Sequence, residues 1–283
     1  MTDTKLEAEI CFAAHKPEAL RLALEYAGED GFVASMPQLM HARAHADYDN
    51  IIWNTWFTAH SEESVVTSPQ GNHVVVVIHG GGIYGTPERF EQMLFANQEE
   101  GGIHGWTDQH AGKICSKEAL GILEGRLQDG TEFPVYSFDE FRQGIADLPS
   151  RYGVTLDFEL ARQSLRGYET FDSLKEDPNM IARAGGVEAN IAYLDRYQAR
   201  HGTTRMGNWH PYNRIDPDQS QTRVMFLAGN DGQLRSEDDD FADYGYDCDY
   251  GLGGDAYMGG MARYVAVAPR DSSTSLRFVP FRS

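Results

Sequence analysis

The stretch VVVVIHGGGIYGTPERF, residues 74–90, indicates a buried strand, a glycine turn and the start of a helix. A continuous run of β-branched residues is typical of a strand that is covered on both faces. The three glycines Gly80–Gly82 let the backbone turn sharply and approach a ligand closely. Thr86 is a suitable N-cap, and Pro87 suits the first helical turn. The stretch therefore predicts free amides that hold an anion or a developing negative charge.

Strand and helix signals alternate between residues 69 and 202, which favours βαβ units and a partly parallel sheet. Residues 1–68 predict a helical extension, whereas residues 203–283 contain strand signals without helices and an acidic loop. We therefore expect a single α/β domain spanning residues 1–283. Its sheet is predicted to be mixed, partly parallel and flanked by helices, with an antiparallel C-terminal part.

The net charge, the hydrophobic pattern and the cysteine count exclude several classes of protein. A net charge of −19 argues against nucleic acid and anionic membranes, because both attract positive surfaces. No apolar run approaches the ~20 residues of a membrane span, and the first nine residues are too polar for a secretory signal. The three cysteines, Cys11, Cys115 and Cys248, are widely spaced, which predicts a reducing cytoplasm rather than a disulfide framework. The composition and the net charge are compatible with a small-molecule ligand. They do not indicate an oligomeric state.

The tetrapeptide His79-Gly80-Gly81-Gly82 resembles the oxyanion-hole loop of the lipase and esterase branch of the α/β-hydrolases. That branch also requires a Gly-x-Ser-x-Gly nucleophile elbow, which this sequence lacks, so the family itself is excluded. Met180–Gly186 repeats the strand-then-glycine pattern, and its Arg183 is predicted to bind an anion at the same sheet edge. The alternative is that the glycines only allow a strand and a helix to pack closely.

Histidines gather in two places. His104, Asp108 and His110 lie in one short segment, and imidazole and carboxylate ligands suit zinc, iron or manganese, which activate water. His41 and His45 are four residues apart and share one face of a predicted helix. Because the chain contains ten histidines, chance clustering and solvated surface side chains are the competing explanations.

The segment 236–255 contains eight acidic residues and no lysine or arginine. In an extended loop Asp247 and Asp249 point the same way, and their carboxylates favour Ca²⁺ or Mg²⁺. A solvated acidic loop without a ligand is the competing explanation.

Two hypotheses follow. The first is a cytosolic hydrolase that holds a small anionic or carbonyl-containing substrate at Gly80–Gly82 and Arg183. Its predicted catalytic residues are His79, His104 and Asp108. A divalent metal (Zn²⁺, Mn²⁺, Ca²⁺ or Mg²⁺) is the expected cofactor, with the predicted ligands His104, Asp108, His110, Asp247 and Asp249. The alternative is a non-catalytic binding or structural subunit whose acidic loop 236–255 binds divalent cations or a basic protein partner.

Overall fold

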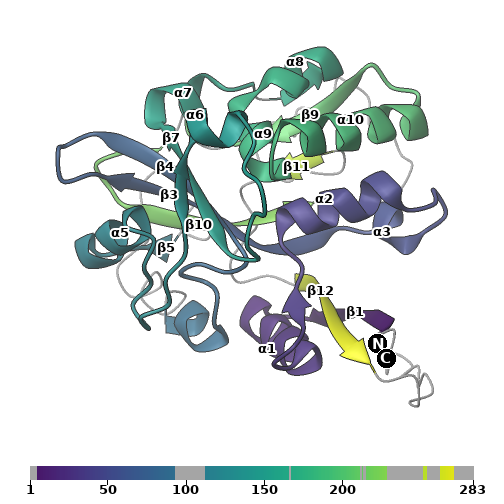
Figure 1. Cartoon of the computed structure of the whole chain (residues 1–283), viewed down its shortest axis with the longest axis horizontal. Helices are drawn as coiled ribbons and strands as arrows, with labels where there is room; N and C mark the ends of the chain where they lie inside the picture. The colour runs from purple at the N-terminus through teal and green to yellow at the C-terminus, as the bar shows by residue number, and fades with distance from the viewer. Residues whose placement is uncertain are drawn as a thin grey trace.

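The strands of the computed structural model form two sheets (Figure 1). The structure describes residues 5–92, 112–165, 167–210, 212, 215–227, 251–253 and 262–270. The strands are β1 (Lys5–Ala13), β2 (Phe32–Val33), β3 (Phe57–Thr67), β4 (His73–His79), β5 (Gly112–Lys113), β6 (Val135–Ser137), β7 (Tyr152–Asp157), β8 (Gly167–Thr170), β9 (Arg205–Trp209), β10 (Gln221–Leu227), β11 (Gly251–Gly253) and β12 (Ala262–Arg270). Within the described residues the small sheet has the order β1-β12-β2. The main sheet has the order β6-β7-β4-β3-β10-β11-β9-β8, with β5 paired to β10.

Helices cover both faces of the main sheet (Figure 1). They are α1 (Lys16–Ala27), α2 (Met36–His45), α3 (Ile51–Asn54), α5 (Ser116–Leu123), α6 (Phe138–Arg142), α7 (Phe158–Gln163), α8 (Phe171–Glu176), α9 (Pro178–Ala184) and α10 (Val187–His201). Residues 87–92 are also helical, as the sequence predicts after the glycine turn. None of the helices in the described ranges is long and apolar enough to cross a membrane.

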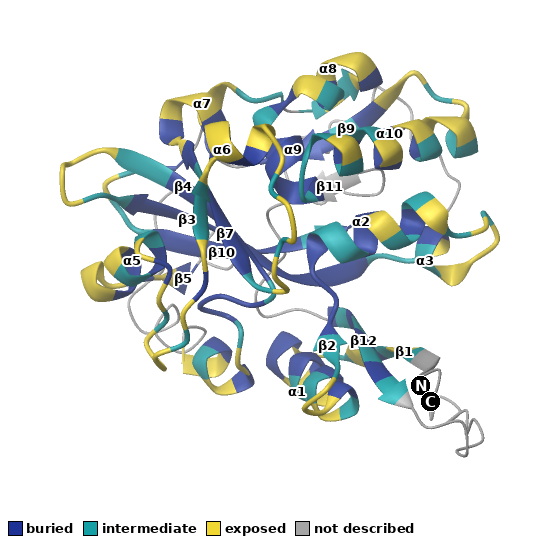
Figure 2. Ribbon diagram, in the orientation of Figure 1, coloured by how far each residue is buried: buried dark blue, intermediate teal, exposed yellow. Residues whose placement is uncertain are grey.

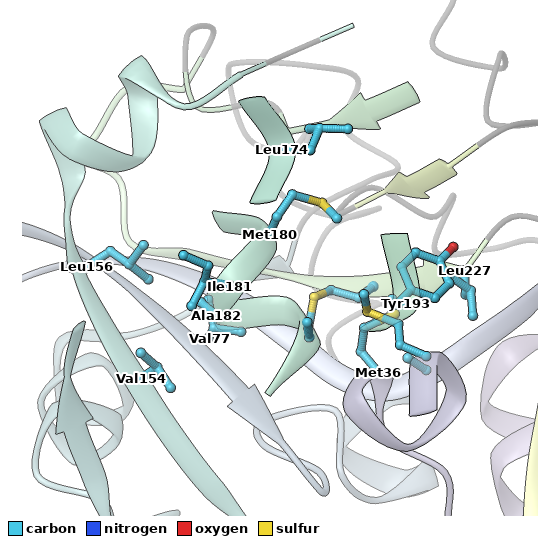
Figure 3. Packing of buried hydrophobic residues seen from close by; sticks show 14 of the residues in the cluster. Met36, Val77, Val154, Leu156, Leu174, Met180, Ile181, Ala182, Tyr193 and Leu227 are labelled. Carbon is cyan, nitrogen blue, oxygen red and sulfur yellow. The ribbon is translucent and has the colours of Figure 1, made fainter. Parts of the chain in front are cut away.

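The strand β4 separates two hydrophobic cores. Val75 and Val77 face the core beneath α2, α9 and α10, whereas Val76 and Ile78 face the core shared with α1, α5 and β12. This alternation follows from the two-residue period of a strand. Figure 3 shows Val77 close to the side chains of α9 in the first core. In Figure 2 the central strands are buried, and the exposed residues lie mostly on the outer sides of the helices.

The sheet is mixed and flanked by helices, so the coarse α/β prediction is confirmed. The expected direction of the central strand is wrong, because β4 runs antiparallel to both of its neighbours, β3 and β7. Parallel pairing in the described part of the chain joins β6 to β7 and β9 to β11. The hydrophobic run predicts burial on both faces, but it carries no information on the direction of the neighbouring strands.

Two further expectations are corrected. The segment 1–68 is not a helical extension, because it supplies β1 to the small sheet and β3 to the centre of the main sheet. The predicted strand around Met180 is the helix α9, whose N-cap Asp177 accepts a hydrogen bond from the Met180 amide and whose first residue is Pro178. The C-terminal strands β10 and β12 do pair antiparallel, with β3 and β1 respectively. The single-domain boundary stays a prediction.

Candidate functional site

The amides of the glycine turn are engaged inside the protein. The Gly80 and Gly81 amides both donate to the His60 carbonyl, at 2.9 and 3.1 Å. Both glycines have positive φ angles, +80° and +91°, which side chains other than glycine adopt at a cost. The expectation of free amides is therefore wrong for Gly80 and Gly81.

The turn does hold a carboxylate, and that carboxylate is the chain's own Glu62. Glu62 accepts hydrogen bonds from the Ile83 amide at 2.6 Å and from the Tyr84 amide at 2.9 Å. Its side chain is buried in β3. A Cβ at Gly82 would collide with the Glu62 carboxylate, so this glycine permits the close approach. The amides that hold an anion are therefore those of Ile83 and Tyr84, not those of the predicted residues Gly80 and Gly81, and the anion is internal.

Burial raises the pKa of the Glu62 carboxyl from 4.5 to about 7. The two amide hydrogen bonds and the charge of Arg151 act in the opposite direction, and the Glu118 carboxylate adds to the rise. In the described part of the chain no cation lies within ion-pair distance of Glu62. Glu62 is therefore a buried acid that titrates near neutrality.

His79 is fully buried at the end of β4, and both of its ring nitrogens are used. Nε2 lies 3.0 Å from the Ala182 carbonyl, which can only accept, so Nε2 carries the proton and donates. Nδ1 then accepts from the Ser61 hydroxyl at 2.8 Å. Burial lowers the pKa of His79 to about 4, so the ring is neutral at pH 7. His79 therefore links β4 to both β3 and α9 through hydrogen bonds.

Arg183 is fully buried on α9, where it binds Glu63 of β3. Its Nε and Nη2 donate to the two carboxylate oxygens of Glu63 at 2.6 and 3.1 Å, and its Nη1 donates to Asn208 Oδ1 at 2.8 Å. The Tyr212 hydroxyl also donates to Glu63, at 2.6 Å. Burial alone raises the pKa of Glu63, but Arg183 and Tyr212 together hold it below its usual value. Arg183 thus has an anion partner, supplied by the same chain.

Glu62 and Glu63 belong to no motif that suggested a functional site. One signal was available: two consecutive acids stand inside a strand pattern, at a position where both faces of the sheet are covered. Acidic residues are rarely buried unless paired. Such a pair in a central strand therefore predicts a partner on each side.

Several predicted residues lie outside the part that the structure describes. These are His104, Asp108, His110, Asp247 and Asp249. The described residues contain no group of three or more histidine, cysteine or acidic side chains arranged to hold a metal ion.

His41 and His45 share one face of α2, as their spacing predicts, with ring centroids 4.1 Å apart. His45 Nδ1 lies 2.8 Å from the His41 carbonyl. Burial and the neighbouring His45 lower the pKa of His41. The two rings therefore contact each other near the surface of α2.

A pocket of about 220 Å³ lies beside the glycine turn, between that turn and α5. Its apolar lining includes Ile83, Leu120 and Ile122. Arg89 and Glu118, which also line it, form an ion pair with each other. The pocket is thus close to the predicted site, but its lining lacks His79 and Arg183.

No family model matches the chain, and the comparison with curated proteins finds no match. A solved structure described as "Accommodation of massive sequence variation in Nanoarchaeota by the C-type lectin fold" is similar, with a TM-score of 0.63 and 20% identity. The similarity covers 93% of this chain and 98% of that chain. At this identity it shows the fold alone.

The hydrolase interpretation is contradicted, because the similar solved structure has a C-type lectin fold and the groups on which the interpretation rested are bonded within the chain. The main prediction rested on free amides at Gly80–Gly82 and on His79 as an acid or base. The amides of Gly80 and Gly81 and both ring nitrogens of His79 are bonded within the chain, and the predicted metal ligands lie outside the described residues. The similarity to a C-type lectin fold concerns the fold, and the alternative, a non-catalytic binding or structural subunit, stays a proposal.

Proposed function

We propose that this chain is a non-catalytic binding protein in which the acidic segment 236–255 contacts the ligand. The observation that supports this most is the internal pairing at the predicted catalytic turn, where the Ile83 and Tyr84 amides hold the Glu62 carboxylate. Amides that already bind the chain's own carboxylate cannot stabilise the oxyanion of a substrate. The similar solved structure, described in terms of massive sequence variation on a C-type lectin fold, agrees with a scaffold of this kind.

The place of the acidic segment in the chain suits this role. β10 ends at Leu227, and β11, which belongs to the segment, pairs with both β10 and β9. The segment is therefore tied to the main sheet through β11. Binding residues are frequently carried by loops that a rigid scaffold positions.

The composition of the segment indicates a positively charged ligand. Its eight acidic residues attract a basic partner and speed the encounter at low salt. Its tyrosines and glycines, among them Tyr244, Tyr246 and Tyr250, are residue types common in the binding loops of antibodies. Asp247 and Asp249 also provide the hard oxygen ligands that Ca²⁺ prefers.

The test compares two double variants with the same change in charge. Asp247→Asn/Asp249→Asn changes the acidic segment, and Asp47→Asn/Asp49→Asn changes an exposed pair with the same spacing between α2 and α3. We expect the first variant alone to weaken the binding of an oligolysine peptide at least fivefold, measured by calorimetry at low salt. An equal loss in both variants would assign the binding to net charge, and the proposal would fail.

Thermal melting with Ca²⁺ distinguishes the two kinds of positive ligand. A Ca²⁺-dependent rise in Tm that Asp247→Asn/Asp249→Asn removes identifies a cation as the ligand of the segment, because a ligand of the folded state raises stability. A response to oligolysine alone identifies a basic partner. If neither probe binds the unchanged protein, the proposal is wrong.

A further inference from the structure

Two arginines on α10 lie together and have no acidic partner in the described part of the chain. Arg196 and Arg200 are four residues apart, so they lie on one face of the helix, where like charges repel. Their guanidinium carbons lie 3.9 and 5.6 Å from the centroid of the same Tyr48 ring. Across the residues that the structure describes, neither guanidinium has a carboxylate within ion-pair distance. Figure 1 shows α10 beside α2 and α3, the elements that flank Tyr48.

The hydrogen bonds of both arginines end on neutral acceptors. Arg196 Nη2 donates to the Ala46 carbonyl at 2.9 Å. Arg200 donates from Nη2 to Asn54 Oδ1 at 2.6 Å and from Nη1 to the Tyr48 carbonyl. Among the residues that the structure describes, the Nε atoms of Arg196 and Arg200 are buried and have no hydrogen-bond partner. The positive charge of the pair is therefore not neutralised by these contacts.

A third cation increases the local positive potential. Arg43 is buried beside Trp53 and donates to the Ile52 and Thr55 carbonyls at 2.8 and 3.0 Å. Burial lowers the pKa of His201 to about 4, and the charges of Arg200 and Arg43 lower it further in the same direction. Arg200 and Arg43 therefore both act electrostatically on the same imidazole.

The nearby acids do not cancel this charge. Asp47 and Asp49 lie on the loop that carries Tyr48, and both are exposed. Asp195 of α10 is paired with Lys175, at 2.6 Å. The chain has a net charge of −19, so an uncompensated group of arginines is a local exception to its overall negative charge.

We propose that Arg196, Arg200 and the Tyr48 ring form a binding site for a small oxyanion: a phosphate, sulfate or carboxylate group. Guanidinium groups bind such oxygens through paired, charge-assisted hydrogen bonds. The competing role is structural. Arginines near a helix C-terminus interact favourably with the helix dipole, and these arginines also donate hydrogen bonds to carbonyl groups of the segment 46–55. The site is separate from the acidic segment and does not depend on the proposed function.

The first test needs no substitution. The pKa of His201 is measured by NMR in the unchanged protein, with and without inorganic phosphate, and with sodium chloride at matched ionic strength. A bound oxyanion stabilises the imidazolium, so we expect phosphate to raise the His201 pKa by one unit or more. Arms with sulfate and with acetate identify which oxyanion binds best. A His201 pKa that is the same in phosphate and in chloride would overturn the proposal.

The second test is a matched pair of variants. Arg196→Gln removes the charge from the site, whereas Arg162→Gln removes an exposed arginine that pairs with Glu159 on α7. We expect the dissociation constant for phosphate to rise at least tenfold in Arg196→Gln and to stay unchanged in Arg162→Gln. Equal affinity in the two variants would contradict the assignment. If Arg196→Gln does not fold, Arg196→Lys keeps the charge but loses the paired geometry, and we expect weakened binding there as well.

Discussion

Glu62 and Glu63 are consecutive residues of β3, and their buried side chains point to opposite faces of the main sheet. Glu62 holds two main-chain amides of the glycine turn, whereas Glu63 holds the guanidinium of Arg183. Burial raises the pKa of Glu62 to about 7, but the pKa of Glu63 is lowered. Amide dipoles alone do not offset the cost of burying a charge here, and a bidentate arginine does.

The contrast also explains the architecture. Glu63 fastens α9 and Tyr212 to one face of the sheet, and Glu62 fastens the glycine turn to the other. Of the residues that the sequence suggested for a substrate site, Arg183 is the partner of Glu63, and the amides that follow Gly82 are the partners of Glu62. The hydrogen bonds of these groups therefore stabilise the scaffold.

The largest expected effect comes from breaking the pair on the Glu63 face. Arg183→Met leaves a buried carboxylate without its cation, so we expect a loss of about 3–5 kcal/mol in the free energy of unfolding, measured with urea. Arg162→Met is the control, because its ion pair with Glu159 is exposed and contributes less than about 1 kcal/mol. A loss below about 1 kcal/mol in Arg183→Met would show that Glu63 does not need its arginine.

The second prediction concerns the pH dependence on the Glu62 face. The pKa of Glu62 is about 7 in the folded chain, against an ordinary value of 4.5. Between these values the folded state binds more protons than the unfolded state. The stability that Glu62 contributes is therefore fully present below pH 4.5 and is lost as the pH rises to 7. Glu62→Gln stays neutral, so its stability relative to the unchanged protein should improve by about 3 kcal/mol between pH 4.5 and pH 8.

Urea unfolding at several pH values checks this prediction, and Glu63→Gln is the matched control. Because the pKa of Glu63 is lowered, its stabilisation is present above pH 4.5 and is lost as the pH falls below that value. Glu63→Gln should therefore be destabilised throughout the neutral range. A difference between Glu62→Gln and the unchanged protein that is constant with pH would refute the raised pKa.

The third prediction separates close packing from backbone strain at the glycine turn. Gly80 and Gly71 have similar φ angles, +80° and +83°. A Cβ at Gly80 would collide with the Ser150 carbonyl, whereas a Cβ at Gly71 meets nothing within 4 Å. We expect Gly71→Ala to cost about 1 kcal/mol from strain alone, and Gly80→Ala to cost about 2 kcal/mol more. Thermal melting of the two variants measures the difference, and equal costs would mean that the turn can relax.

The same contrast shows which features the sequence could predict. The strand at residues 74–78 was predictable because burial on both faces is recorded in the β-branched run itself. The partners of Glu62 and Glu63 were not, since they lie 21 and 120 residues away along the chain. Strand direction depends on such distant pairings as well, which is why β4 was expected to be parallel and is antiparallel.

The helix α9 differs from the partners of Glu62 and Glu63, because the residues that indicate this helix are neighbours in the sequence. Asp177 and Pro178 form a typical N-cap and first-turn pair, yet the short apolar run after them also suits a strand. The glycines that follow, Gly185 and Gly186, reinforced the likeness to the first glycine turn. Arg183 was thereby assigned to a sheet edge, whereas it lies in the core beside Glu63.

The smallest predicted effect compares one tyrosine hydroxyl on each face of the sheet. The Tyr212 hydroxyl donates to the Glu63 carboxylate at 2.6 Å, and the Tyr84 hydroxyl donates to the neutral Thr222 carbonyl at 3.3 Å. Hydrogen bonds to charged groups contribute more than those to neutral groups. We expect Tyr212→Phe to cost about 2 kcal/mol and Tyr84→Phe about 1 kcal/mol in urea unfolding at pH 7. Because the pKa of Glu63 is lowered, the two costs should converge only in acid, once Glu63 is protonated, and a gap that persists after its protonation would show that the charge of Glu63 is not its cause.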